Sequence, residues 1–171
     1  MNHIVLYQPE IPQNTGNIMR TCVATGATLH LIEPLGFSLD EKYVKRSAAN
    51  YLEHLTYHVY KDLDAFFAAN EGEFYYFSRY GVKRPDELDL SATDKEHYYV
   101  FGSESTGLPK AFLKHQLERA FRLPMSDKVR SLNLSNCAAI VIYEAMRQQD
   151  YPGLSAFEPE IYKGKDYLKK L

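Results

Sequence analysis

The chain has 171 residues, of which 45% are hydrophobic and 25% charged, and its formal net charge at pH 7 is −2. This length and composition predict one folded domain with a sizeable core. The negative net charge excludes nucleic-acid binding through bulk attraction, so a nucleic-acid partner would have to be held by local basic clusters. The clusters are Lys42, Lys45 and Arg46; Lys83 and Arg84; Lys128 and Arg130; and Lys163, Lys165, Lys169 and Lys170. Taken singly, such a cluster is more often an ordinary solvated face.

The cysteines and the first residues bear on the compartment. Cys22 and Cys137 are too few for a secreted disulfide scaffold, so a reducing compartment is expected. No apolar run reaches the length of a membrane span, and the first ten residues lack an export signal. We therefore expect a cytoplasmic protein with no membrane partner. Of the histidines, His54 and His58 have helical i, i+4 spacing without a carboxylate or cysteine partner nearby, so no metal is expected.

The first half of the chain alternates strand and helix patterns. Residues 3–7 predict a buried strand, and the pattern from Asn14 to about Gly26 predicts a helix that Asn14 caps. Further elements are predicted in this order: a strand at 28–32, one or two helices within 40–55, a short strand at 57–60 and a helix at 62–70.

The second half continues the alternation. Strands are predicted at 73–78, 97–101 and 120–124, with a helix starting at Pro109 and a strong helix from about Asn133 to Gln149. This order predicts an α/β fold with a mainly parallel sheet flanked by helices. Residues 156–171 are polar and are expected to be a peripheral tail, which leaves residues 1–155 as a single domain.

Several common sites are absent from the sequence. The turn after the first predicted strand reads QPEIPQNTGN, without the glycine pattern of dinucleotide-binding proteins or of the common Rossmann-type methyltransferases. Neither a phosphate-binding P-loop nor a G-x-S-x-G elbow is present.

Polar residues gather instead in two segments of the first and middle parts of the chain. Within 14–22, Asn14 precedes Arg20, a side chain that could bind a phosphate or stabilise an oxyanion. Within 98–109, a buried strand runs into Gly102, Glu104 and Gly107, at the strand end where ligands of open α/β sheets sit. Considered alone, the first segment is more often a helix cap with a solvent-facing Arg, and the second is about as often an ordinary strand–loop–helix connection as a ligand site.

A third segment, residues 121–145, leads from a predicted strand through a polar loop into the strong helix. Ser131, Asn133, Ser135 and Asn136 lie within six residues of one another. Serine and asparagine near a helix start are capping residues by default, but four of them exceed what one cap needs. The surplus could bind polar groups of a ligand.

Together, the three segments resemble, in order and spacing, the three motifs of the SpoU branch of the SPOUT (trefoil-knot) RNA methyltransferases. The motifs read N-x-G-x-x-x-R, F-G-x-E-x-x-G-[LI] and [IL]-P-M…S-L-N-[LV]-S-x-A. The matching residues are Asn14 and Arg20; Gly102, Glu104 and Gly107; and Leu123, Pro124, Met125, Ser131, Asn133 and Ser135. Cys137 stands where alanine is usual. The likeness covers roughly residues 3–153 and is closest to the YibK/TrmL group.

The resemblance implies a deep C-terminal trefoil knot, an exception to the usual unknotted topology, and a homodimer in which both subunits contribute to each active site. It implies S-adenosylmethionine as cofactor and methylation of the ribose 2′-hydroxyl of the wobble nucleotide, cytidine or modified uridine 34, in the anticodon stem-loop of leucine tRNAs. It also implies the site residues. Cofactor-binding residues are Ser78, Gly102, Leu123, Ser131 and Asn133, and catalytic-site residues are Arg20, Asn14 and Glu104.

Two alternatives stay open at this point: the same chemistry on another tRNA or rRNA position, and a knotted RNA-binding module without catalysis. Tyr75, Tyr76 and Tyr80 could stack on an unpaired anticodon base, although the alternation around residues 74–78 favours core packing for most of them.

Overall fold

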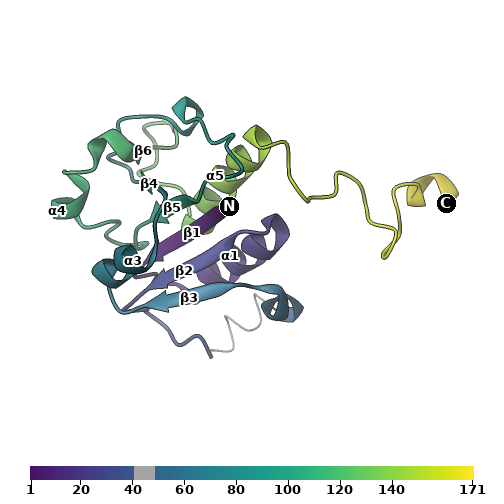
Figure 1. Ribbon diagram of the computed structural model, residues 1–171, viewed down its shortest axis with the longest axis horizontal. Coiled ribbons are helices and arrows are strands. Elements are labelled where there is room, and N and C mark those ends of the chain that lie inside the picture. Colours follow the sequence, from purple (N-terminus) through teal and green to yellow (C-terminus); the bar gives the residue numbers. More distant parts are fainter. Residues whose placement is uncertain (41–48) are drawn as a thin grey trace.

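The computed structural model describes residues 1–40 and 49–171. Its helices and strands, labelled as in Figure 1, are β1 Asn2–Tyr7, α1 Pro12–Thr25, β2 Thr28–Ile32, β3 Tyr57–Tyr60, α3 Leu63–Ala69, β4 Glu73–Phe77, β5 His97–Phe101, α4 Lys110–Leu113, β6 Ala120–Phe121 and α5 Leu134–Gln148. Short 3₁₀ helices lie at Ala49–His54, Pro85–Glu87, Leu117–Arg119 and Tyr167–Lys170.

The strands form one sheet in the order β3-β2-β1-β5-β4-β6, and neighbouring strands pair in parallel. The chain leaves β1 through α1 toward β2, and it leaves β5 through α4 toward the other side of the sheet. The order of connections therefore reverses between β1 and β5. Ligands of open α/β sheets bind at the carboxyl ends of the strands at such a switch point.

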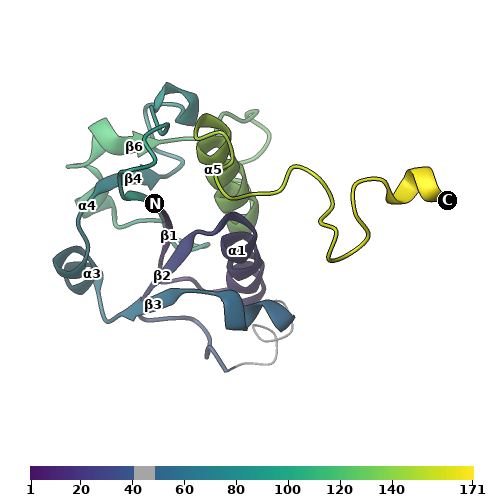
Figure 2. The ribbon, with the colours of Figure 1, turned by 45° about the vertical axis from the view of Figure 1, so that its right-hand side comes forward.

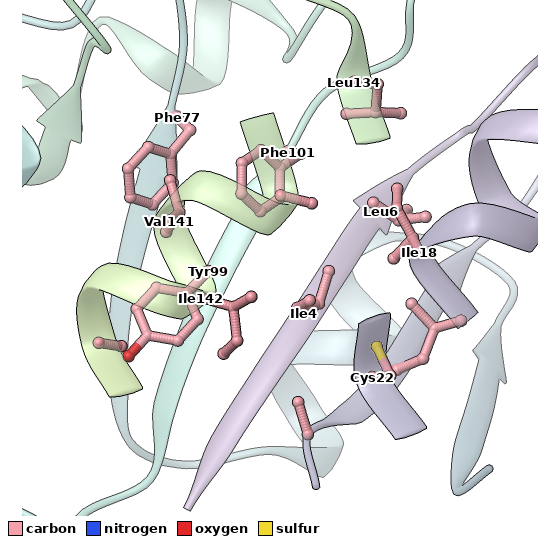
Figure 3. Close-up of a cluster of buried hydrophobic side chains, with 14 of the residues drawn as sticks. Ile4, Leu6, Ile18, Cys22, Phe77, Tyr99, Phe101, Leu134, Val141 and Ile142 are labelled. Atoms are coloured by element: carbon pink, nitrogen blue, oxygen red, sulfur yellow. The ribbon is translucent and has the colours of Figure 1, made fainter. Parts of the chain in front are cut away.

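Helices cover both faces of the sheet. The long helices α1 and α5 pack against each other on one face, and α3 and α4 lie on the other (Figures 1 and 2). The larger core cluster fills the first interface, where Ile142 of α5 lies beside Tyr99 of β5 and Ile18 of α1 lies near Leu6 of β1 (Figure 3). The predicted α/β fold with a parallel sheet is confirmed.

Most predicted elements are present, and one strand differs from the expectation. The strand expected at 120–124 has only two residues, Ala120–Phe121. Beyond it, Arg122 still donates its amide to the Lys83 carbonyl, but Pro124 has no amide hydrogen with which to extend a ladder. Within the predicted helical stretch 40–55, residues 49–54 form a 3₁₀ helix. The basic cluster of Lys42, Lys45 and Arg46 lies outside the described residues.

The cysteines and two of the tyrosines follow the expectation from the sequence. Cys22 is buried in α1, Cys137 is half-buried in α5, and neither forms a disulfide. Tyr75 and Tyr76 are core residues, whereas Tyr80 is exposed. Over the described part of the chain, no helix has the length and apolarity that a membrane crossing requires.

A buried chain of polar side chains joins the first two strands on the α3 face. His3 Nδ1 lies 2.9 Å from His30 Nε2, and His30 Nδ1 lies 2.9 Å from the Tyr60 hydroxyl. Burial lowers the pKa of His30 to about 3. Burial also lowers the pKa of His3, although its contact with Glu96 acts in the opposite direction.

These shifts predict acid sensitivity. In the unfolded chain a histidine has a pKa of about 6.5. Between about pH 6.5 and pH 3, His30 is protonated in the unfolded chain but neutral in the folded protein. The free energy of unfolding therefore falls as the pH drops from about 6.5 toward 3. We expect His30 alone to lower the free energy of unfolding by about 2 kcal/mol between pH 7 and pH 5, measured by urea unfolding. His30→Gln, which cannot titrate, should show a smaller loss over the same range. An equal loss in this variant would contradict the assignment.

Candidate active site

A cavity of about 640 Å³ opens at the carboxyl ends of β4, β5 and β6. Its walls are the loops that follow these strands, the segment before α5, and the start of α1. This volume lies within the range of small-molecule sites, roughly 300–1,000 Å³. The cavity adjoins the switch point between β1 and β5, where the topology favours a ligand.

The structure brings together seven of the eight site residues expected from the sequence. Ser78 follows β4, Gly102 and Glu104 follow β5, and Leu123 follows β6. The full set of expected residues that line the cavity is Asn14, Ser78, Gly102, Glu104, Leu123, Ser131 and Asn133. Their roles toward a ligand stay predictions. The eighth residue, Arg20, does not line this cavity.

The loop after β5 is built around a very close backbone approach. A Cβ on Gly102 would lie 2.1 Å from the Gly107 carbonyl carbon and 2.2 Å from the Leu108 nitrogen. The Gly107 amide donates to the Ser103 carbonyl at 2.9 Å, which closes the loop into a tight turn. Gly107 itself has φ 71°, a left-handed conformation that favours glycine. Any side chain at position 102 would force the cavity wall to move.

Glu104 caps a helix that is distant in sequence. Its carboxylate accepts hydrogen bonds from the backbone amides of Glu10 (2.8 Å) and Ile11 (3.0 Å) and from Asn14 Nδ2 (3.2 Å). Helix α1 has no side-chain cap of its own at Ile11. An anion at a helix N-terminus is stabilised by the exposed amides and by the helix dipole. Glu104 thus fixes the start of α1 against the loop after β5.

The predicted cap by Asn14 is wrong. The helix starts two residues earlier, at Pro12, because proline is well suited to the first helical position. Asn14 is buried, and its side chain donates to Glu104 and accepts a bond from Asn133 Nδ2 at 2.9 Å. Asn133 in turn caps α5 by accepting from the Ser135 amide at 2.9 Å. One chain of hydrogen bonds, Glu104–Asn14–Asn133, therefore joins all three sequence motifs.

Arg20 lies on the exposed side of α1, outside the cavity of its own chain. Its guanidinium carbon is 5.0 Å from the ring centroid of Tyr51, a cation–π distance. A role for Arg20 in chemistry at the cavity would therefore require a second subunit to bring it there.

The cavity also has three cationic lining residues that the sequence did not indicate as site residues, Arg79, Lys110 and Arg122. Tyr80, which the sequence indicated as a possible contact for an RNA base, lines the cavity as well. Arg122 Nε is buried, and among the described residues it has no hydrogen-bond partner. Each cation follows a strand end or opens a helix, which is the one signal that could have found them. Arg130, from one of the predicted basic clusters, also lines the cavity.

The other predicted basic cluster of the body is engaged by carboxylates instead. Lys83 pairs with Glu118 at 2.9 Å and Arg84 with Asp86 at 3.1 Å. Across residues 1–40 and 49–171 no group of three or more histidine, cysteine or carboxylate side chains is arranged to hold a metal ion.

The capping role of Glu104 gives a direct prediction. In Glu104→Gln the amide NH₂ would face one of the two backbone N–H donors and leave it unsatisfied. We expect a loss of about 2–3 kcal/mol in the free energy of unfolding, measured by urea unfolding. Glu10→Gln is the matched control, since the Glu10 carboxylate accepts from the Ser105 hydroxyl and caps nothing. Equal stability of the two variants would contradict the cap.

The parallel sheet, the cavity at its switch point and the bonded frame around it define an α/β protein with a small-molecule site at the strand ends. A family model described as the SpoU rRNA Methylase family matches residues 1–143. The chain belongs to the SpoU methylase family.

Three similar proteins extend the comparison. The tRNA (cytidine(34)-2′-O)-methyltransferase of Methylovorus glucosotrophus is 45% identical over 156 residues, 90% of this chain and 99% of the relative. A solved structure from Bacillus anthracis has a TM-score of 0.87 and 53% identity, covering 91% of this chain and 98% of that one. A structure described as giving insights into the 2-OH methylation of C/U34 on tRNA has a TM-score of 0.79 and 40% identity, covering 88% and 97%.

About a tenth of this chain has no counterpart in these nearly full-length matches.

Proposed function

We propose that this chain is a cytoplasmic, S-adenosylmethionine-dependent methyltransferase of the ribose 2′-hydroxyl of nucleotide 34, cytidine or modified uridine, in leucine tRNAs. The observation that carries the proposal is one cavity walled by Gly102 of the second motif together with Leu123 and Ser131 of the third. Relatives that match nearly along their whole length bear the corresponding cytidine-34 name or description.

The lining of the cavity fits S-adenosylmethionine. The glycine at position 102 lets a ligand approach the backbone where a Cβ would collide, and Arg122 Nε is a buried donor without a partner among the described residues. A carboxylate or a ribose hydroxyl would satisfy such a donor. We assign the binding of this cofactor to Ser78, Gly102, Leu123, Ser131 and Asn133, which all line the cavity. When bound, it supplies an activated methyl group on a sulfonium.

The protein's own part in the reaction is to position the ribose and to ease removal of the 2′-hydroxyl proton. Arg20 is the proposed catalytic residue. A guanidinium stays charged in proteins, so its role is to hold the adjacent phosphate and stabilise the developing alkoxide rather than to act as a base. Asn14 and Glu104 hold the frame of the site through their bonds to each other and to Asn133.

The position of Arg20 is our reason for proposing a homodimer. Since Arg20 lies outside the cavity of its own chain, we propose that it serves the cavity of a second copy. Ile140 and Tyr143 support such a contact because both are exposed apolar residues three positions apart on α5.

Tyr80 is the proposed contact for an unpaired anticodon base. It lines the cavity and is 49% exposed, unlike Tyr75 and Tyr76. The Arg79 guanidinium carbon lies 5.1 Å from its ring centroid and the Lys110 Nζ lies 5.9 Å away. An aromatic ring flanked by cations suits a single-stranded RNA base and its phosphates.

We also propose the trefoil knot that the resemblance implies. The loop after β4 lies directly against the β6 segment: the Ser78 amide donates to the Phe121 carbonyl at 3.0 Å and the Val82 amide to the Ala120 carbonyl at 3.1 Å. A Cβ on Gly81 would lie 2.2 Å from the Phe121 carbonyl carbon. This close contact is compatible with a threaded chain.

The experiment that tests the function is incubation of the protein with methyl-labelled S-adenosylmethionine and total RNA, followed by mapping of the labelled nucleotide. Label on the 2′-oxygen of nucleotide 34 in leucine tRNAs is the expected result. Label confined to rRNA or to another tRNA position would contradict the substrate assignment. RNA binding without any label would point to a non-catalytic module.

A further inference from the structure

The tail, residues 156–171, runs away from the folded body beyond α5 and ends in a short 3₁₀ helix (Figures 1 and 2). Its apolar side chains are unusually bare: Phe157 is 69% exposed, Ile161 85% and Tyr162 72%. Adjoining exposed apolar residues of this kind mark an interaction surface. The match to the family model ends at residue 143, before this stretch.

The charge of the tail differs in sign from that of the chain. Residues 156–171 contain four lysines and three acidic residues, a side-chain net charge of +1, whereas the whole chain carries −2. The four lysines all lie in residues 161–171, where Asp166 is the one acidic residue, and both glutamates, Glu158 and Glu160, precede them. Lys169 pairs with Asp166 at 2.8 Å. Within this segment, which the structure describes in full, no ion pair engages Lys163, Lys165 or Lys170. The end of the tail, residues 161–171, is therefore a local basic segment on an acidic protein.

A tight turn sets these lysines against aromatic rings. The Pro159 carbonyl accepts from the amides of Tyr162 (3.0 Å) and Gly164 (3.1 Å). Gly164 has φ 74°, and a Cβ there would lie 2.4 Å from Glu160 Oε2. Around this turn, Lys163 Nζ lies 4.6 Å from the ring centroid of Tyr167. Cations that alternate with aromatic faces match the phosphates and bases of RNA.

The tail leaves the body at the end opposite to the cavity. Helix α5 begins beside the cavity, where Asn133 is its N-cap, and ends at Gln148. The side chain of its C-cap, Gln149, bonds to Asn2 at the start of β1. A ligand that contacts both the cavity and the tail must therefore be long. A folded RNA has this extent, whereas a free nucleotide does not.

We propose that residues 156–171 form a second RNA-contacting surface, which holds the substrate tRNA away from the reacting nucleotide through Lys163, Lys165, Lys170 and Tyr162. This inference rests on the proposed function. A second copy of the chain would be an alternative partner for the tail. Such a contact would use the exposed apolar side chains, and the lysines of residues 161–171 would add nothing to its stability.

The test is a triple variant, Lys163→Gln/Lys165→Gln/Lys170→Gln, assayed for methyl transfer to tRNA. We expect KM for tRNA to rise about tenfold, with kcat and the Kd for S-adenosylmethionine unchanged. In a plot of the logarithm of the tRNA binding constant against the logarithm of the salt concentration, we expect the slope to become less steep by about 2–3. Lys61→Gln/Lys95→Gln/Lys114→Gln, three exposed lysines of the body, is the matched control. An equal effect of the control would mean that only net charge matters and would overturn the proposal.

Two single variants separate RNA from a protein partner. Tyr162→Ala should raise KM for tRNA, and Ile161→Ala should leave it unchanged. The reverse pattern, with a lower molecular mass of the assembly for Ile161→Ala, would show that the tail docks onto another copy. Normal methylation with an unchanged KM in the triple variant would contradict the role of the tail and leave the proposed function intact. Absence of any transfer by the wild-type protein would sink the proposed function, while tRNA binding would still report on the tail.

Discussion

Replacing Arg20 with alanine is expected to lower kcat for methyl transfer by about 10³-fold and to leave the Kd for S-adenosylmethionine unchanged. The reason is that a guanidinium which steadies a developing alkoxide acts on the transition state and not on the cofactor. Arg20 lies outside its own cavity, so its removal should not disturb the cofactor site. Single-turnover kinetics and calorimetric titration give the two quantities. Normal transfer by Arg20→Ala would remove this residue from the mechanism.

Mixing two inactive proteins tests whether Arg20 acts across a dimer. Arg20→Ala keeps an intact cavity, and Leu123→Trp keeps Arg20 but fills the cavity that Leu123 lines. Half of the dimers in an equal mixture are mixed, and each has one complete site if Arg20 serves the partner. We therefore expect about a quarter of wild-type activity after subunit exchange. No recovery in dimers shown to have exchanged would contradict action across the interface.

Gly102→Ala is the second change with a large expected effect. The new Cβ would lie 2.1 Å from backbone atoms of the loop that forms the cavity wall, and backbone cannot rotate away as a side chain can. We expect the free energy of unfolding to fall by about 1–3 kcal/mol. We also expect affinity for S-adenosylmethionine to fall about 100-fold because the wall is displaced.

Gly26→Ala is the matched control for this prediction. Gly26 has a left-handed φ of 71°, and nothing lies within 4 Å of a Cβ placed there. It should lose about 1 kcal/mol of stability through backbone strain and keep its cofactor affinity. If Gly102→Ala binds S-adenosylmethionine like the wild type, the loop after β5 does not wall the cofactor site. Should Gly102→Ala not fold, Leu123→Trp tests the same cavity, and undiminished binding by it would contradict the assignment.

The sheet could be predicted from the sequence because its strands are short, β-branched or aromatic runs separated by helical periodicity. The sequence predicts a longer strand than the two residues of β6 because the residues after it keep a strand-like composition. Pro124 has no amide hydrogen, so it cannot continue the hydrogen-bond ladder. The carboxyl ends of parallel strands share one edge, so motif residues that follow β5 and β6 could be expected to meet.

The contacts within the site could not be predicted in the same way. Asn14 looks like a helix cap because capping propensity is a local property, whereas its real partners, Glu104 and Asn133, are 90 and 119 residues away in the chain. Arg122 and Tyr80 follow strands, but the direction of a side chain in a loop depends on packing that no local pattern encodes. The position of Arg20 outside the cavity likewise depends on how α1 packs, which no local pattern encodes.

The most direct test of the central claim is a crystal structure of this protein with S-adenosylhomocysteine, the product of the proposed reaction. We predict that the ligand lies in the cavity at the carboxyl ends of β4, β5 and β6, in contact with Gly102, Leu123 and Ser131. A ligand bound elsewhere on the protein, with this cavity empty, would contradict the account.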